Sequence, residues 1–128
     1  MKDKTIYVLH ANICKALANP IRIEIIEILG DRELAFTDLQ AETNVLKSNL
    51  SQHLSLLVSN GILVQRRVGL RAYYKLSSEK IATACRIMRE ILVDNLNKQH
   101  DVMDRVVRPH GDRLACCVGH EHHRYCFV

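Results

Sequence analysis

Hydrophobic residues recur at helical spacing in the first quarter of the chain. Over residues 6–17 the apolar positions repeat every three to four residues, and Asn19 and Pro20 interrupt the pattern because the residue before a proline disfavours helical geometry. Pro20 suits the first turn of a second helix over residues 21–29, and Gly30 is a typical helix stop. This second segment is apolar on most sides, so we expect it at the centre of the core.

A short helix, a tight link and a longer helix are predicted next. Thr37 is placed to cap the short helix over residues 38–42, and residues 44–46 form the link. The longer helix covers residues 47–59, and its leucines are spaced as a buried stripe. These leucines are Leu50, Leu54 and Leu57. Two helices joined in this way, the second with a polar outer face, predict a helix-turn-helix.

A β-hairpin and a long final helix complete the pattern. Residues 62–67 and 72–76 are rich in β-formers, and the four residues between them include a glycine. A hairpin directly after a helix-turn-helix is a wing. Ser77 or Ser78 then caps a helix with a broad apolar stripe, which ends before Pro109. The fold class predicted is therefore mainly α with a β-hairpin wing, a winged helix-turn-helix.

The net charge changes this picture once it is located along the chain. The formal net charge is only +4, but residues 43–78 contain no Asp or Glu and five cations. These are Lys47, Arg66, Arg67, Arg71 and Lys75. The other residues carry 13 Lys and Arg against 14 Asp and Glu, a net charge of −1. A basic segment without acidic residues favours a polyanionic partner, most often nucleic acid, over a merely solvated loop.

Composition narrows the class of protein. The 128 residues are 48% hydrophobic and 25% charged, which is typical of one soluble globular domain. No segment has the apolar length of a membrane span, and the N-terminus lacks the apolar core of a signal peptide. We therefore expect a cytoplasmic protein with reduced thiols and no membrane partner. Five cysteines in that setting favour metal binding or redox sensing over disulfides.

The helix over residues 47–59 carries small polar side chains opposite its leucine stripe. Such side chains fit the major groove, about 12 Å wide, and Gln52 is the best candidate for pairing with adenine. Lys47 and the wing arginines should contact phosphates or the minor groove. His53 is either a DNA contact or a packed residue, and only one of Tyr73 and Tyr74 can face DNA. The candidate DNA-binding residues are Lys47, Ser48, Asn49, Ser51, Gln52, His53, Ser55, Arg66, Arg67, Arg71 and Tyr73.

Four segments occur in a characteristic order: KALANPIRIEII over residues 15–26, LSQHLSLL over 50–57, NGIL over 60–63 and RVGLRAYYKL over 67–76. With them the sequence resembles the ArsR/SmtB family of winged-helix repressors. The resemblance implies an ααααββα core and a homodimer formed through the first and last helices. It also implies binding to palindromic double-stranded operator DNA, repression, and release when an effector binds. The effector itself varies within the family.

The effector sites of that family map incompletely onto this chain. The Cys-x-Cys pair at the start of the helix-turn-helix is absent, and Arg113 stands where the final-helix zinc site needs its last ligand. A dithiol switch of the persulfide-sensing type would use Cys85 on the final helix. The other helical thiol, Cys14, lies on the first helix instead of the second. The alternative for both thiols is a structural role as small buried residues.

The end of the chain is rich in soft metal ligands. Residues 110–128 hold three of the five cysteines and four of the seven histidines. Some family members with a similar tail respond to As(III) or Sb(III), which favour three thiolates. The candidate thiolates are Cys116, Cys117 and Cys126, and possible further ligands for zinc or cadmium are His120, His122 and His123. The alternative is a tail that binds metal only opportunistically. The domains expected are 1–107, for DNA binding and dimerisation, and 108–128, a Cys/His-rich C-terminal tail.

The predicted function is a DNA-binding transcriptional repressor that As(III), Sb(III) or another thiophilic metal releases through the tail cysteines. Two alternatives stay open: a thiol-based redox or persulfide sensor, and a zinc- or cadmium-responsive repressor that uses tail Cys and His. An enzyme is disfavoured, since the chain has no placed general base and no glycine-rich phosphate loop. A winged helix that binds protein is disfavoured by the basic segment. No organic cofactor is expected.

Overall fold

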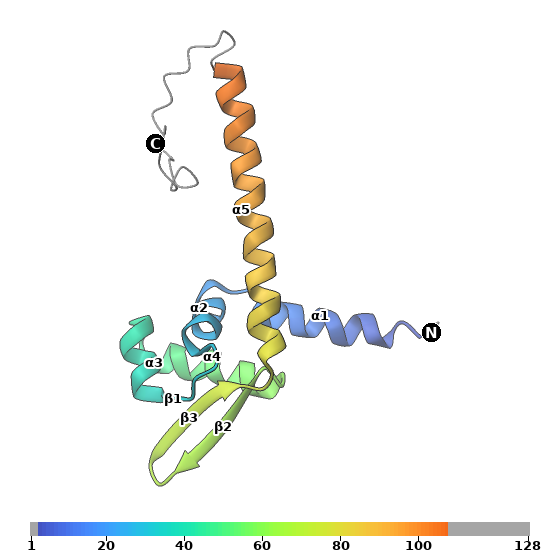
Figure 1. Cartoon of the computed structure of the whole chain (residues 1–128). Coiled ribbons are helices and arrows are strands. Elements are labelled where there is room, and N and C mark those ends of the chain that lie inside the picture. The colour runs from blue at the N-terminus through green and yellow to red at the C-terminus, as the bar shows by residue number, and fades with distance from the viewer. Residues whose placement is uncertain (1–2, 108–128) are drawn as a thin grey trace. The chain divides into compact units, whose positions relative to one another are not determined.

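The computed structural model describes residues 3–107, with side chains described for residues 3–100. Its elements in chain order are α1 (Thr5–Leu17), α2 (Pro20–Leu29), β1 (Leu34–Ala35), α3 (Phe36–Thr43), α4 (Lys47–Ser59), β2 (Leu63–Val68), β3 (Arg71–Leu76) and α5 (Glu79–Val107) (Figure 1). The chain divides into two compact units between Cys85 and Arg86. The predicted class, a mainly α-helical winged helix-turn-helix, is confirmed.

The core of the first unit lies where α2, α3, α4 and the sheet meet. Its largest fully buried side chains are Ile25, Ile26, Leu29, Leu39, Leu50, Leu54, Leu57 and Ile62. The central place predicted for α2 is confirmed, because α2 contacts α1, α3, α4 and β3. The leucine stripe of α4 is buried, as its spacing predicts. The first turns of α5 also reach this core through Ile81, Ala82 and Cys85.

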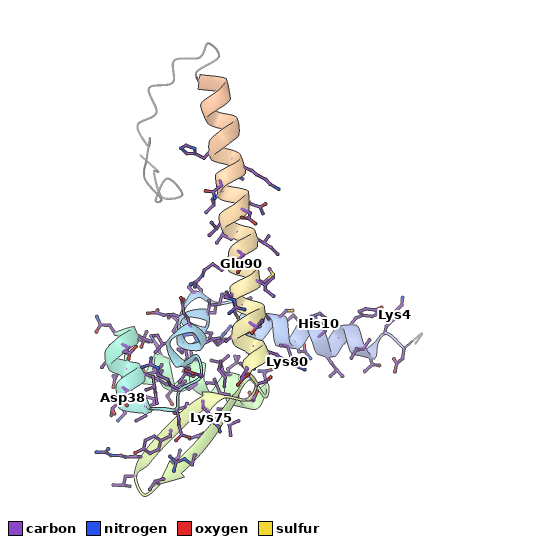
Figure 2. All side chains as sticks on the ribbon, viewed as in Figure 1. Lys4, His10, Asp38, Lys75, Lys80 and Glu90 are labelled. Atoms are coloured by element: carbon purple, nitrogen blue, oxygen red, sulfur yellow. The ribbon has the colours of Figure 1, made fainter. Side chains whose placement is uncertain are left out.

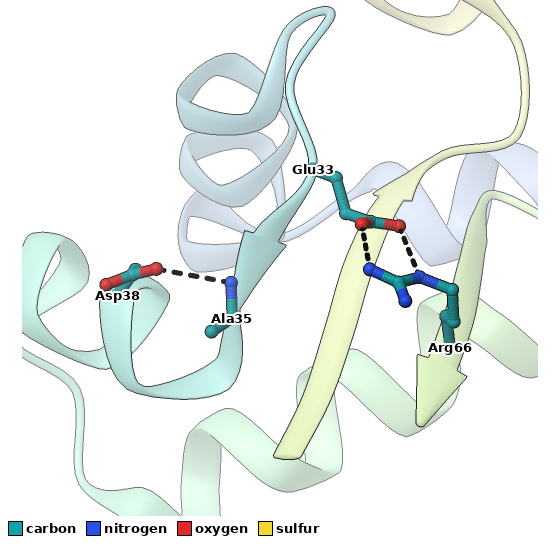
Figure 3. Close-up of polar contacts among 4 residues, drawn as sticks. All are labelled: Glu33, Ala35, Asp38 and Arg66. Atoms are coloured by element: carbon teal, nitrogen blue, oxygen red, sulfur yellow. Dashed lines mark hydrogen bonds and ion pairs between the residues drawn. The ribbon is translucent and has the colours of Figure 1, made fainter. Parts of the chain in front are cut away.

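The helix ends follow local capping chemistry, with one correction. The side chain of Asn19 caps α2, since its Oδ1 accepts hydrogen bonds from the backbone N–H of Ile21 at 2.9 Å and of Arg22 at 3.3 Å. The predicted Thr37 cap is wrong. The chain passes directly from β1 into α3, so Ala35 holds the N-cap position and has no side-chain oxygen to offer. The Asp38 carboxylate instead accepts a hydrogen bond from the Ala35 backbone N–H at 3.3 Å (Figure 3).

The sheet has one strand more than predicted. The strand order is β1-β3-β2, and both pairings are antiparallel. Strand β1 has only two residues, which pair with Tyr73 and Tyr74 of β3. The hairpin turn is tighter than predicted: Val68 pairs with Arg71, which leaves a two-residue turn. Gly69, the first residue of that turn, has φ +60°, a conformation that glycine adopts without a steric penalty.

The final helix α5 begins at Glu79, where the structure supports the Ser78 cap. The Ser78 hydroxyl accepts a hydrogen bond from the Lys80 backbone N–H at 3.2 Å. Within the described residues α5 extends to Val107. No helix among these residues is both long and apolar enough to cross a lipid bilayer. The predicted tail, 108–128, lies outside the described residues, so the domain boundary there stays a prediction.

Candidate nucleic-acid interface

Helix α4 presents the polar face that the sequence predicts. Its predicted DNA-binding residues other than His53 are all exposed: Lys47, Ser48, Asn49, Ser51, Gln52 and Ser55. Lys47 is the first residue of the helix. Leu46 at the N-cap makes no side-chain cap hydrogen bond, and the first turn contains no acidic residue. The N–H groups and the positive dipole end of α4 are therefore not neutralised locally.

A groove separates the start of α3 and the start of α4 from the hairpin. Its lining includes three cations, Lys47 of α4 and Arg67 and Arg71 of the hairpin, together with Ser51, and it includes no Asp or Glu. We call this feature the basic groove. Among the described residues none forms a hydrogen bond or an ion pair with the side chains of these three cations. The basic groove is therefore a concentration of positive charge without a counterion from the described part of the chain.

The pleat of the hairpin decides which side chains reach the basic groove. Side chains alternate between the two faces of a strand, so Arg67 shares a face with the buried Tyr74 and Arg66 lies on the opposite face with Tyr73. Arg71 lies at the end of β3 beside the turn and also lines the basic groove. The structure thus brings Lys47, Arg67 and Arg71 together but places Arg66 and Tyr73 elsewhere.

Arg66 has a counterion that lies outside the basic segment of the sequence. Its Nη2 is 2.6 Å from Oε1 of Glu33, and its Nε donates to Oε2 of Glu33 at 3.3 Å (Figure 3). The guanidinium carbon lies 4.8 Å from the centroid of the Tyr73 ring. The hydrogen bond from Arg66 lowers the pKa of the Glu33 carboxyl, and Lys75, on the hairpin in Figure 2, adds a smaller electrostatic contribution. The roles predicted for Arg66 and Tyr73 in DNA binding remain predictions.

His53 is half-buried and faces α2. Its Nδ1 lies 3.5 Å from Nη1 of Arg22, whose Nη2 donates to the Lys15 backbone carbonyl, also at 3.5 Å. Burial, and to a lesser extent the charge of Arg22, lowers the pKa of His53 below its usual value of 6.5. The neutral imidazole has a lone pair that accepts from Arg22. This environment favours the packed interpretation of His53, and a direct DNA contact stays a prediction.

The two adjacent tyrosines have separate environments. Tyr74 is 7% exposed and lines the basic groove, which confirms that one of the pair packs inward. Burial raises the pKa of Tyr74, and the charge of Arg67 partly offsets this effect. Tyr74 therefore forms part of the groove floor as a neutral phenol.

The predicted metal ligands lie outside the described residues. They are Cys116, Cys117 and Cys126, with His120, His122 and His123. Within the described part of the chain, His, Cys, Asp and Glu form no group of three or more that could hold a metal ion. Cys14 is exposed on α1 in the single chain, so the buried alternative does not hold for it there, whereas Cys85 is half-buried against the core.

Comparison with known proteins defines the family. The family model described as "Bacterial regulatory protein, arsR family" matches residues 19–64. The HTH-type transcriptional regulator Rv0081 of Mycobacterium tuberculosis, described as uncharacterized, is 31% identical over 105 residues, which cover 81% of this chain and 92% of Rv0081. The chain belongs to the arsR family. Because the family consists of bacterial regulatory proteins and Rv0081 is named a transcriptional regulator, the prediction of a regulator and not an enzyme is confirmed.

Solved structures and a further relative extend this assignment. The crystal structure of Rv0081 aligns with a TM-score of 0.68 at 32% identity and covers 76% of this chain and 98% of that one. The homodimeric winged helix-turn-helix domain of Mb0332 from Mycobacterium bovis aligns with a TM-score of 0.64 at 28% identity, covering 72% and 86%. An arsenical resistance operon repressor of Staphylococcus xylosus is 33% identical over 69 residues, or 54% of this chain and 66% of the repressor.

Proposed function

We propose that this arsR-family protein is a transcriptional repressor that binds operator DNA as a homodimer and releases it when a soft metal or metalloid binds its C-terminal cysteines. The observation that carries the DNA-binding part is the basic groove between α4 and the hairpin. Lys47, Arg67 and Arg71 lie there without a counterion among the described residues. A DNA phosphate supplies the missing negative charge.

The proposed arrangement places the exposed face of α4 in the major groove. Gln52 pairs there with an adenine, and the neighbouring serines and Asn49 reach base edges or phosphates. The basic groove holds the sugar-phosphate backbone beside α4. In this arrangement the three groove cations set affinity and its salt dependence, whereas Gln52 sets the choice of sequence.

Exposed apolar side chains support the dimer. Helix α1 exposes Ile6, Tyr7, Val8, Leu9 and Ile13, each at least 45% exposed. In the second unit, α5 exposes Ile87, Met88, Ile91 and Leu92, each at least 48% exposed. Several large apolar side chains exposed on one helix favour an interaction site, and the related Mb0332 domain is a homodimer. A two-fold symmetric dimer implies a palindromic operator with two half-sites.

The proposed sensor is the C-terminal tail, with Cys116, Cys117 and Cys126 as ligands for As(III) or Sb(III). Three thiolates suit these ions, and the related S. xylosus protein is named for arsenical resistance. Zinc or cadmium is the alternative effector, for which His120, His122 and His123 add ligands. The cytoplasm, where thiols stay reduced, is the compartment this chemistry requires. A thiol-based switch is a second candidate, because Cys14 is exposed.

The test is a titration of the reduced full-length protein, bound to its own promoter DNA, with As(III), Cd(II), Zn(II) and a persulfide donor. As(III) should release the wild type from DNA at a lower concentration than the other three compounds. The double variant Cys116→Ser/Cys117→Ser should stay bound at that As(III) concentration. Cys14→Ser is the matched control and should respond like the wild type. Release of the double variant at the wild-type As(III) concentration would eliminate the tail as sensor. A response lost only in Cys14→Ser would establish the thiol switch instead.

A further inference from the structure

On one face of the sheet, an ion pair links β2 to the residue before β1 across the central strand β3. Arg66 extends from β2 over Tyr73 of the central strand β3. It binds the carboxylate of Glu33, the residue immediately before β1 (Figure 3). Both carboxylate oxygens of Glu33 accept hydrogen bonds, at 2.6 and 3.3 Å. A fork-shaped guanidinium on a carboxylate fixes orientation as well as distance. This pair therefore connects two strands that do not hydrogen-bond to each other.

Strand β2 lies at one edge of the described sheet. Strand β2 hydrogen-bonds only to β3 among the described strands, and β1 contributes only two residues to the sheet. The far end of the hairpin is exposed at Val68 and Leu70. A side-chain link from β2 to the start of β1 thus restrains the base of the wing. Because Arg67 follows Arg66 directly, the direction of β2 at this point also decides where the Arg67 side chain lies in the basic groove.

The same contact sets Arg66 apart from the cations that line the basic groove. Lys47, Arg67 and Arg71 have no counterion among the described residues, whereas Arg66 has Glu33. Glu33 lies 33 positions before Arg66 in the sequence, so the contact depends entirely on the fold. Arg66 also lies on the face opposite the basic groove. The Arg66 side chain is 55% exposed, but its contact with Glu33 and its position away from the basic groove indicate a role in holding the hairpin.

We propose that Glu33 is a positioning residue for DNA binding. It holds Arg66 across Tyr73 and thereby fixes the wing beside α4. Because Arg66 is paired with Glu33, it is not one of the cations that contact phosphate. The inference rests on the proposed function, since it requires that the protein bind duplex DNA. In this arrangement Lys47, Arg67 and Arg71 contact phosphate and Arg66 does not.

The test measures the affinity of the full-length protein for its promoter duplex at several KCl concentrations, for the wild type, Arg66→Gln, Glu33→Gln and the double variant. Arg71→Gln is the matched control for a lost phosphate contact, and its slope of log affinity against log salt should become shallower by about 0.9 per subunit. Arg66→Gln should lower affinity by about twofold to fivefold with the wild-type slope. Glu33→Gln should lower affinity to the same extent in the wild type and have no further effect in the Arg66→Gln background.

Two results would overturn the inference while leaving the proposed function intact. One is a shallower slope for Arg66→Gln that matches Arg71→Gln, since Arg66 would then contact phosphate itself. The other is an equal effect of Glu33→Gln with and without Arg66, or a gain in affinity, since Glu33 would then act on DNA by repulsion. Absence of salt-dependent binding by the wild type would remove the proposed function itself. Thermal unfolding of each variant checks that all are folded.

Discussion

Removing the charges of the basic groove should change the salt dependence of DNA binding by a predictable amount. Lys47, Arg67 and Arg71 are exposed and have no ion-pair partner among the described residues, so replacing all three with Gln leaves no buried charge unpaired. Each cation that binds a phosphate adds about 0.9 to the slope of log affinity against log salt. The triple variant should therefore lose about 2.7 from the slope per DNA-bound subunit. Between about 50 and 200 mM salt, its affinity should fall less than that of the wild type by a factor of about forty for each DNA-bound subunit.

Fluorescence anisotropy with a labelled promoter duplex at five or six KCl concentrations measures this slope. Lys75→Gln is the control, because Lys75 is on the same hairpin but does not line the basic groove. It removes one charge and should leave the slope at the wild-type value. The reasoning is refuted if the triple variant keeps the wild-type slope, or if Lys75→Gln lowers the slope as much as one groove cation.

Three further predictions concern the scaffold that supports this surface. Leu54→Ala removes most of a side chain that is 1% exposed and leaves a cavity in the core. It should lower the free energy of unfolding, measured by urea titration, by about 2–5 kcal/mol. Ser55→Ala, the control at the next position on the exposed face of α4, should change it by less than about 0.5 kcal/mol. Asn19→Ala removes the cap of α2 and should cost about 0.5–2 kcal/mol, and Asn19→Asp should keep most of the stability. The pKa of His53 in the folded protein lies below 6.5, so as the pH falls His53 is protonated in the unfolded chain before it is protonated in the folded protein. The free energy of unfolding should therefore be highest above pH 6.5 and decrease as the pH falls below it. Urea titrations at pH 7 and pH 6 should show a smaller loss for His53→Gln, and an equal loss would contradict this role.

The helices and the hairpin could be predicted from the sequence because their apolar spacing repeats over many residues. The bounds of α4 are an example: three leucines define its buried side, and Asn60 follows directly at its end. Strand β1 could not be predicted in this way, since two residues have no periodicity and its pairing with Tyr73 and Tyr74 is non-local. The prediction of a Thr37 cap is wrong for a related reason: β1 leads directly into α3, which therefore starts at Phe36, two residues earlier than predicted.

The sequence predicts which cations belong to the candidate site but not which of them lie together in the folded protein. The sequence locates the five cations of the basic segment, yet it does not reveal that Glu33 neutralises Arg66 from outside the segment. One signal was available: alternation along β2 separates Arg66 from Arg67 once the buried face of the hairpin is assigned. The contact between His53 and Arg22 joins residues 31 positions apart, so no local pattern could predict it.

The central claim is that α4 chooses the DNA sequence while the basic groove holds the backbone. Selection of bound duplexes from a random-sequence pool, by the wild type and by Gln52→Ala, tests this claim directly. The account predicts that the wild type enriches a dyad-symmetric motif and that Gln52→Ala loses the preference for adenine at one position in each half-site while the rest of the motif persists. Enrichment of no motif by the wild type, or of an identical motif by both proteins, would contradict it.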